Sequence, residues 1–527
     1  MSDWFDLQRA LSSGKVDRRS FIKYATALGI GSIAAQSVLT KAGYAAGPKA
    51  GGVLRLAMGG GSSTDSLDPR TIGDTVPIVT GFCLYNSLVE IDADGNATPE
   101  LAESWEPRPG AKEWVFNIRK GVTFSNGKTL DADDIIYSVN LHRGPSTTSG
   151  GAAVMQAIKD IKKLSPYQIL VTLDSPDADM PTFFADYHMQ VVPNGFTDWA
   201  NPVGTGAFTL ESFQPGVHIK MKKRDGYWKQ GRGHLDGIDL TVVNDTMARI
   251  NALVSGSVDS INRVDGKTAS LITGQNVQLV RSPGAQHYTA PMMIDRKPYD
   301  NPDTRLALKY ALDREAVLKT VLNGYGSLGN DHPIRPSDPF CNTSLPQYAV
   351  DLDKARFHAK KAGLGNSQLT LSCSDGAFPG AVDLAILYQA NAEKAGMNVK
   401  IDRQPADGYW DNVWLKAAWC TSFWVARASA TQVLTIAYQS AAPWNDTHWH
   451  SQSFDKLLAE AKAELDTAKR KAKLWELQRM LHDDGGQVVA VFADRLEACS
   501  TAVGGHTPHG LDEMDNGRIG EKAWLSS

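Results

Sequence analysis

The chain of 527 residues is slightly acidic, with 54 Lys and Arg against 58 Asp and Glu, and 42% of its residues are hydrophobic. An acidic balance does not suit a nucleic-acid-binding protein, whose affinity depends on basic residues placed against phosphates. The length and the apolar fraction instead favour a globular chain of two or three domains.

The first 46 residues resemble a twin-arginine export signal. Arg18 and Arg19 precede a modest apolar run over residues 24–35, and small residues follow at positions 43–46. The run is too short and too diluted by polar residues for a membrane anchor, which needs about 20 strongly apolar residues. We therefore expect residues 1–46 to be a removable signal and the mature chain to be periplasmic. Without the signal the net charge falls from −4 to −7.

Strands and helices are predicted to alternate in the first half of the mature chain. A strand is expected over residues 53–58, and tight turns are expected at 94–96, at Asn126-Gly127 and at Pro215-Gly216. Asp131 and Asp245 precede apolar residues at helical spacing and are predicted to cap helices. The stretch LAESWE, residues 101–106, is expected to be helical, with both apolar residues on one face.

The second half continues the mixture. A long helical stretch is predicted from Pro302 to Gly324, a helix over residues 383–396 that leads into a strand at 398–404, two amphipathic helices over 454–465 and 467–486, and a last strand at 487–493. Strands and helices mixed throughout predict α/β domains built on mixed sheets.

Short catalytic and phosphate-binding motifs are missing from the sequence. Two histidine pairs, 448 with 450 and 506 with 509, have no third ligand nearby, which favours hydrogen-bonded histidines over a metal site. Five scattered cysteines permit one or two disulfides in an oxidising compartment, but buried free thiols are favoured.

Six stretches stand in a particular order along the chain: Ser66-Leu67-Asp68-Pro69, LYNSLVEIDADGNATPELAESWE, VFNIRKGVTFSNGKTLDADDIIYS, NPVGTGAF, NALVSGSVD and PYDNPDTRLALKYALDRE. Together they resemble the extracytoplasmic solute-binding proteins of ABC importers, family 5, the group of dipeptide-, oligopeptide- and nickel-binding proteins. The resemblance implies an α/β fold with mixed sheets and two lobes, the large three-domain variant of the type II periplasmic binding protein fold, with the ligand cleft between the lobes.

The same resemblance implies a division of the chain. The first lobe would comprise a discontinuous domain of residues 47–82, 200–285 and 490–527 and an inserted domain of residues 83–199. The second lobe would be residues 286–489. Two apolar strands, near His287-Tyr288 and near residues 489–492, would cross between the lobes and act as a hinge.

The resemblance also implies a binding protein and not an enzyme. It would capture a peptide or a peptide-like, carboxylate-bearing small solute and deliver it to ABC permease subunits with an associated ATPase. We expect no cofactor and no metal site, a monomer, and contact with the membrane only through the permease. The alternative is an exported enzyme, such as a hydrolase, that uses a related cleft.

Aromatic and polar residues on loops that flank strands are the candidate ligand contacts, because Trp and Tyr offer a large, stiff contact area. The candidates are Ser63, Thr64, Asp65, Tyr85, Tyr288, Trp424, Arg427, Thr431, Trp444, Asn445 and, in the same group, Trp449. For each aromatic residue, packing in the core is the alternative interpretation.

Peptide-binding members of the family commonly hold the α-ammonium group with an aspartate a few residues after a tryptophan in the second lobe. The corresponding stretch, residues 423–432, has no acid but carries Arg427. Ordinary ammonium capture is therefore not expected there, because a buried ammonium needs a carboxylate partner. We expect Arg427 to bind a carboxylate or phosphate bidentately, with Ser429 and Thr431 adding hydrogen bonds.

Two alternatives remain open for this stretch. Arg427 could pair with a protein carboxylate and only fix the loop, and Asp65 or Asp407 could supply the missing acid. The expected solute is a modified amino acid, an opine-like conjugate or a short peptide held in an unusual way.

Overall fold

The computed structural model describes residues 48–145, 147–272, 276–365 and 367–526, together with Phe21 and Tyr24. The predicted export signal, with Arg18 and Arg19, otherwise lies outside the described residues.

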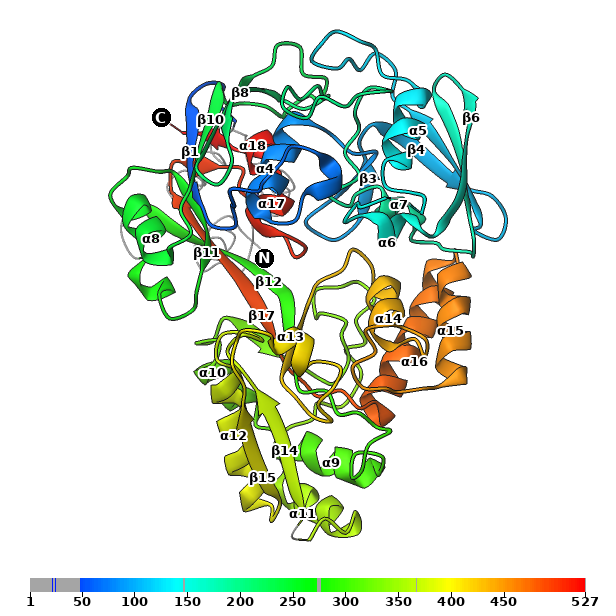
Figure 1. Cartoon of the computed structure of the whole chain (residues 1–527), viewed down its shortest axis with the longest axis vertical. Coiled ribbons are helices and arrows are strands. Elements are labelled where there is room, and N and C mark those ends of the chain that lie inside the picture. The colour runs from blue at the N-terminus through cyan, green and yellow to red at the C-terminus, as the bar shows by residue number, and fades with distance from the viewer. Residues whose placement is uncertain are drawn as a thin grey trace.

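The chain folds into two lobes joined by two long strands (Figure 1). β12 (Val277–Thr289) and β17 (Val489–Ser500) pair antiparallel and pass from the upper lobe to the lower one, with His287 opposite Phe492. They are the two connecting strands that the sequence predicts. Because a paired ribbon keeps its hydrogen bonds when it bends or twists, it can join two lobes without unfolding.

One side of the upper lobe is built on the nine-stranded sheet that contains the connecting strands. Its order is β16-β12-β17-β11-β1-β10-β9-β8, with β13 beside β17. β1 pairs in parallel with β10 and β11, whereas β8, β9 and β10 pair antiparallel, so the sheet is mixed as predicted. The elements of this side are β1 (Val53–Met58), η1 (Pro69–Thr71), α4 (Thr75–Leu84), β8 (Phe208–Gln214), β9 (His218–Lys223), β10 (Gly237–Val242), α8 (Thr246–Val254), β11 (Ser260–Val264), η2 (Ala269–Leu271), β18 (Val503–Gly504), α17 (Glu513–Asn516), α18 (Ile519–Lys522) and β19 (Trp524–Leu525).

The other side of the upper lobe has a four-stranded antiparallel sheet of order β4-β5-β7-β6. Its elements are β2 (Val89–Ile91), β3 (Ala97–Pro99), β4 (Ala102–Pro107), β5 (Glu113–Ile118), α5 (Ala132–Asn140), α6 (Ala152–Met155), β6 (Ile158–Ser165), β7 (Gln168–Leu173) and α7 (Met180–Phe183). Asp131 caps α5 with a complete capping box, and Asp245 caps α8, as predicted.

The expectation of a helix at residues 101–106 is wrong, because most of this stretch forms β4. Trp105 lies opposite Phe116 of β5, with the ring centroids 6.2 Å apart. The cross-strand partner therefore decides the conformation of this short stretch.

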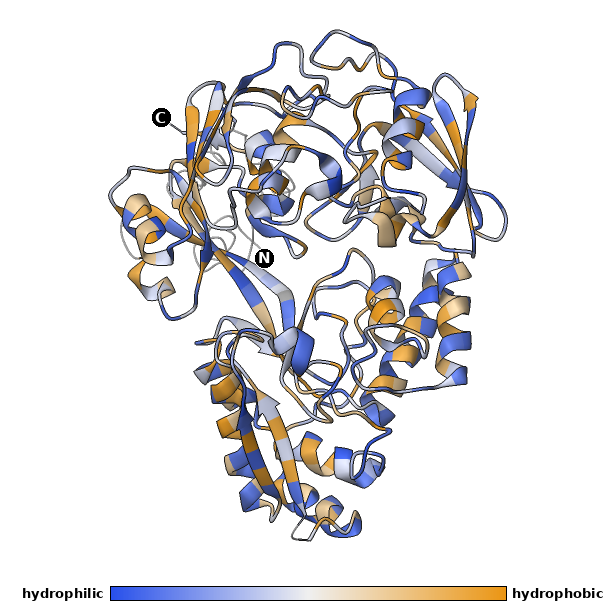
Figure 2. Cartoon of the chain, viewed as in Figure 1, coloured by the Kyte–Doolittle hydropathy of each residue, from blue (hydrophilic) through white to orange (hydrophobic). Residues whose placement is uncertain are grey.

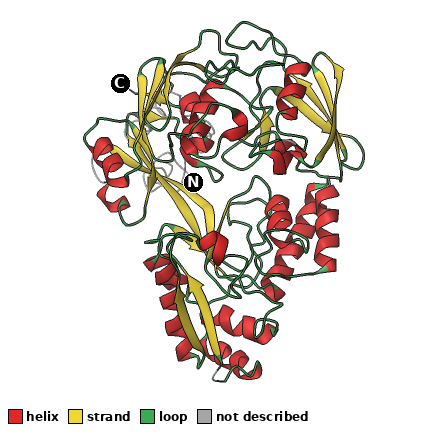
Figure 3. Ribbon diagram, in the orientation of Figure 1, coloured by secondary structure: helices red, strands yellow, loops and turns green. Residues whose placement is uncertain are grey.

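The lower lobe combines helices with a parallel strand pair, β14 and β15 (Figure 3). Its elements are α9 (Pro302–Ala311), α10 (Arg314–Thr320), β13 (Gly326–Leu328), α11 (Leu352–Lys361), β14 (Gln368–Cys373), α12 (Ala381–Lys394), β15 (Asn398–Arg403), α13 (Tyr409–Asn412), β16 (Ser422–Val425), α14 (Ala430–Tyr438), α15 (Gln452–Ala463) and α16 (Thr467–Asp484). Hydrophobic and hydrophilic residues alternate along α15 and α16 (Figure 2), as expected for helices with one packed face.

The long helix predicted from Pro302 is in fact two helices. α9 begins at Pro302 as predicted but ends at Ala311, and Asp313 caps α10 by accepting a hydrogen bond from the Ala316 amide. A second capping residue inside the stretch thus restarts the helix in a new direction.

All five cysteines are buried and free, in agreement with the favoured interpretation of the sequence. Among the described residues, no helix combines the length and the apolar character that crossing a membrane requires.

Candidate ligand site

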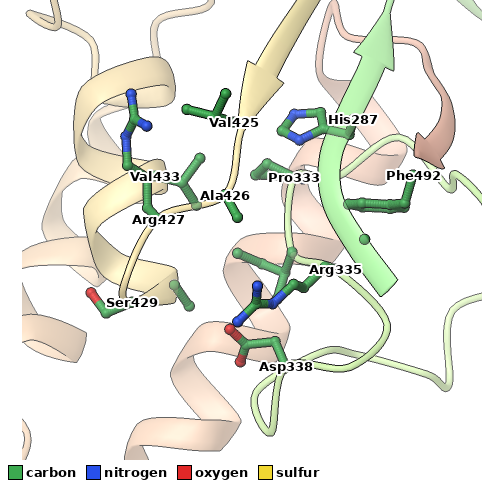
Figure 4. Close-up of a pocket in the computed structure, with 13 residues that line it drawn as sticks. His287, Pro333, Arg335, Asp338, Val425, Ala426, Arg427, Ser429, Val433 and Phe492 are labelled. Atoms are coloured by element: carbon green, nitrogen blue, oxygen red, sulfur yellow. The ribbon is translucent and has the colours of Figure 1, made fainter. Parts of the chain in front are cut away.

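A pocket lies where the lower ends of the connecting strands meet the segment between β16 and α14 (Figure 4). It holds about 340 Å³ of empty space, part of which is open to solvent. Its lining residues are Gly284, His287, Pro333, Ile334, Arg335, Asp338, Val425, Ala426, Arg427, Ser429, Ala430, Val433 and Phe492.

The segment from β16 to α14 is fixed at both ends. β16 pairs with β12, with Trp424 opposite His287, and the Ser429 hydroxyl caps α14 by accepting a hydrogen bond from the Gln432 amide. Arg427 lies between these two anchors, two residues beyond the strand. Arg427 lines the pocket, and its contact with a ligand stays a prediction.

Arg427 is half-buried, and among the described residues its guanidinium has no hydrogen bond and no ion pair. Its side chain extends along α14, away from Arg335 and Asp338 (Figure 4). Burial lowers the pKa of Arg427, and the upper-lobe groups Tyr187 and Asp186 oppose that shift. The alternative pairing with a protein carboxylate is thus not found within the described chain, and the guanidinium is available to an anion.

Three further polar residues of the pocket were not predicted. Arg335 donates a hydrogen bond to the carbonyl oxygen of Gly510 in the upper lobe, and burial raises the pKa of Asp338. Burial lowers the pKa of His287 to about 3, so its ring is neutral, and its buried Nε2 has no hydrogen-bond partner in the part of the chain that the structure describes. Residues 333–338 carry no motif, so only the fold brings them to the pocket.

Thr431 takes part in a contact between the lobes. Its hydroxyl donates to the carboxylate of Asp179, which lies just before α7 in the upper lobe and also pairs with Arg470 of α16. All three residues are buried. Burial alone would raise the pKa of Asp179, but Arg470 and the hydroxyl groups of Thr431 and Ser429 lower it below its ordinary value.

A second pair of contacts lies beside this one. The Ala178 amide donates to the Lys462 carbonyl oxygen at 2.7 Å, and Lys462 Nζ lies 3.2 Å from a carboxylate oxygen of Asp177. Residues 177–179 of the upper lobe thus dock against the ends of α14, α15 and α16 in the lower lobe.

The predicted residues of the upper lobe lie away from the pocket lining. Asp65 closes a turn after β1, where its carboxylate accepts a hydrogen bond from the Ser62 amide at 2.8 Å, and Ser63 and Thr64 are exposed in the same turn. Tyr85 is fully buried, and its hydroxyl donates to the Leu67 carbonyl oxygen at 3.2 Å.

The side chains of Tyr288 and Asn445 make contacts within the lower lobe and do not line the pocket. Tyr288 is buried and stacks on Phe378, with ring centroids 4.0 Å apart. The Asn445 side chain donates to the Trp449 carbonyl oxygen at 2.8 Å, and Trp449 is buried with its indole N–H bonded to Asp484.

Trp424 and Trp444 belong to a cluster of aromatic rings close to the pocket segment. Trp424 is buried, Trp444 is 44% exposed, and their ring centroids are 6.3 Å apart. Both Trp424 and Trp414 donate indole hydrogen bonds of 3.3 Å to the buried carboxylate of Asp446. Asp407, which the sequence offered as a substitute acid, is exposed.

In the described part of the chain, one group of acids is close enough to hold a metal: Glu90, Glu100 and Glu521. Lys229 lies 3.1 Å from Glu90 and 2.7 Å from Glu100, and Arg518 pairs with Glu100 at 2.7 Å. These cations already balance the carboxylates, so the group is explained as a buried charge network.

Two lobes joined by a pair of strands, with a pocket at the lower ends of those strands, are the architecture of a type II periplasmic binding protein. Residues 96–446 match the family model described as bacterial extracellular solute-binding proteins, family 5. The chain therefore belongs to solute-binding protein family 5.

Known proteins similar to the chain include the glutathione-binding protein GsiB of Salmonella paratyphi A, with 27% identity over 58% of this chain. That match covers only 60% of the relative's own length. The dipeptide-binding protein of Escherichia coli is 24% identical over 82% of this chain and 88% of its own length. The structure of AgaA from A. tumefaciens in complex with agropinic acid has a TM-score of 0.72 at 25% identity, covering 90% of this chain and 99% of that one.

Proposed function

We propose that this protein is the substrate-binding component of an ABC importer, which captures a small solute outside the cytoplasmic membrane and delivers it to permease subunits with an associated ATPase. The observation that carries the proposal is Arg427, a half-buried guanidinium on the wall of the pocket that has no ion pair within the described part of the chain. A desolvated arginine without a partner is unfavourable, and an anionic ligand removes that cost.

The proposed solute is small and bears a carboxylate. The carboxylate would bind Arg427 bidentately. The relatives' names, which mention glutathione, dipeptide and agropinic acid, are compatible with a peptide-like or conjugated amino acid.

The proposal includes a binding role without catalysis, a monomer, and contact with the membrane through the permease alone. It also includes the division of the chain into a discontinuous domain (47–82, 200–285, 490–527), an inserted domain (83–199) and a second lobe (286–489). The placement of β12 and β17 between the lobes supports this division.

Calorimetry on Arg427→Ala, with the solute identified by native mass spectrometry of the purified protein, tests the proposal. We expect a loss of affinity of about tenfold or more, because a hydrogen bond to a charged group contributes about 1.5 to 3 kcal/mol. Arg427→Lys should recover only part of it, because an ammonium cannot make the bidentate contact. Arg403→Ala, which removes an exposed arginine of the same lobe, is the control.

A loss below about 1 kcal/mol for Arg427→Ala would remove this residue from the site. Chemical conversion of the solute by the purified protein would instead favour the exported enzyme.

Export by the twin-arginine route is part of the same proposal, supported by the Arg18-Arg19 pair ahead of a short apolar run. Replacing both residues by lysine should leave the protein in the cytoplasm, because the receptor reads the guanidinium pair and not the charge alone. Cell fractionation measures this, and normal periplasmic accumulation of the double variant would contradict it.

A further inference from the structure

The aromatic rings near β16 form a continuous cluster, here called the tryptophan cluster. It consists of Trp410, Trp414, Phe423, Trp424 and Trp444. Neighbouring ring centroids lie 5.5 to 6.3 Å apart in mostly edge-to-face or tilted arrangements. The outer members are accessible, since Trp410 is 37% and Trp444 is 44% exposed.

The tryptophan cluster is backed by a buried negative group. One oxygen of Asp446 accepts the indole N–H bonds of Trp414 and Trp424, and the other oxygen is buried and has no hydrogen-bond partner among the described residues. Only 3% of Asp446 is exposed. No lysine or arginine of the described chain forms an ion pair with Asp446; among its charged neighbours is His448, which bonds to Asp295.

The rings of this cluster also lack the cation that other aromatic residues of the protein have. Arg70 lies 5.6 Å from the ring of Trp199, and Arg119 lies 5.2 Å from the ring of Trp228. Over the described residues, no lysine or arginine stands over any ring of the tryptophan cluster at such a distance. Exposed indole faces and an uncompensated carboxylate behind them favour a positive charge from outside the chain.

We infer that the tryptophan cluster is a binding site for an ammonium group, with Trp444 as its main contact and Asp446 as the buried counter-charge. Because both carboxylate oxygens are buried, the ligand would meet ring faces and not the acid itself. Ring faces bind alkylated ammonium ions well, since such ions need no hydrogen-bond acceptors. Asp446 would add a long-range attraction and hold two indoles in place.

This inference deepens the proposed function, on which its assignment of a substrate class rests. Arg427 follows Trp424, a member of the tryptophan cluster, by three residues, so one short segment of chain joins the two sites. A solute with a carboxylate at Arg427 and an ammonium group at the tryptophan cluster would be a zwitterion. The acid that the stretch 423–432 lacks would then be supplied by Asp446, 22 residues beyond Trp424.

Choline and its uncharged isostere 3,3-dimethyl-1-butanol are the probes that test the site, with tryptophan fluorescence and calorimetry as readouts on the full chain. We expect saturable binding of choline at millimolar concentration and at least tenfold weaker binding of the alcohol. Trp444→Leu should weaken choline binding about fivefold or more, and Trp444→Phe should retain most of it, because phenylalanine keeps an aromatic face. Trp444 is exposed, so neither variant should disturb folding.

Asp446→Asn separates charge from shape, since the amide oxygen can still accept the indole hydrogen bonds. It should weaken choline binding about threefold or more at pH 8. Equal binding of the two probes, absence of saturable choline binding, or an unchanged affinity in both Trp444→Leu and Asp446→Asn would overturn the inference. The Arg427 experiment is independent of these results, because choline has no carboxylate.

Discussion

Asp446 combines two properties at the scale of a single residue: its carboxylate is buried, and it accepts two indole hydrogen bonds. Burial raises the pKa of Asp446 to about 7, although those hydrogen bonds favour the charged form. The hydroxyl of Tyr438 and the thiol of Cys420 also lie within its electrostatic reach. The charge behind the tryptophan cluster therefore changes close to neutral pH.

The stability of the protein should depend on this group in a defined pH window. The folded-state pKa of Asp446 is raised above the ordinary value, so the unfolded chain releases this proton first as pH rises from 4 to 7, and the folded state loses relative stability over that range. At about 1.4 kcal/mol per pKa unit, the cost reaches a few kcal/mol above pH 7.

Asp446→Asn should therefore gain stability relative to the wild type as pH rises, and the difference in free energy of unfolding should level off above pH 7. Urea unfolding at pH 4.5, 6 and 8 measures the difference. A difference that stays constant with pH would contradict the raised pKa.

Sequence reasoning found some residues of the site and missed others for a physical reason. Arg427 was identifiable because it follows Trp424 by three residues, in the stretch where the family resemblance implies an aspartate. Asp446 was missed because its role depends on two indoles that lie 22 and 32 residues away. Burial and cross-chain partners of that kind exist only once the chain has folded.

The sequence predicted helices correctly where a capping residue stood directly before several turns of apolar residues at helical spacing. Asp131 and Asp245 each accept a hydrogen bond from the first turn of the helix that follows. The prediction failed at residues 101–106, because six residues cannot distinguish a helical face from alternation along a strand. The pairing of β4 with β5, which is not visible in the local pattern, decides that stretch.

The ends of α14 and α16 show how elements from distant parts of the sequence make one contact. The first turn of α14 offers a hydroxyl and the positive end of a helix dipole, and α16 offers Arg470, so that both favour a carboxylate. Asp179, more than 250 residues earlier in the chain, fills that place. Thr431 is thus engaged by the protein itself, which leaves Arg427 as the group of this segment that is free for a ligand.

At the scale of the whole molecule, the lobes are joined covalently by two strands and contact each other through residues 177–179 and through Arg335. Closure of a two-lobed binding protein is an equilibrium between open and closed states, which ligand binding shifts. Contacts that exist only when the lobes meet stabilise the closed state. The Asp179 contact is buried and ionic, so its loss should have a measurable effect on that equilibrium.

Asp179→Asn should increase the population of open molecules, because it removes the charge that Arg470 and Thr431 bind and leaves a buried guanidinium without its partner, at a cost of roughly 3 kcal/mol. Pulsed electron paramagnetic resonance between spin labels at Leu164→Cys and Phe357→Cys measures the distance between the lobes. Both positions are exposed, while the native cysteines are buried and should label slowly.

Thr431→Val should shift the distances in the same direction but less, since it removes one hydrogen bond. Asp198→Asn, an exposed substitution in the upper lobe with the same change of charge, should leave the distances unchanged. If Asp179→Asn and the wild type gave the same distance distribution, the contact would be a consequence of closure and not a cause of it.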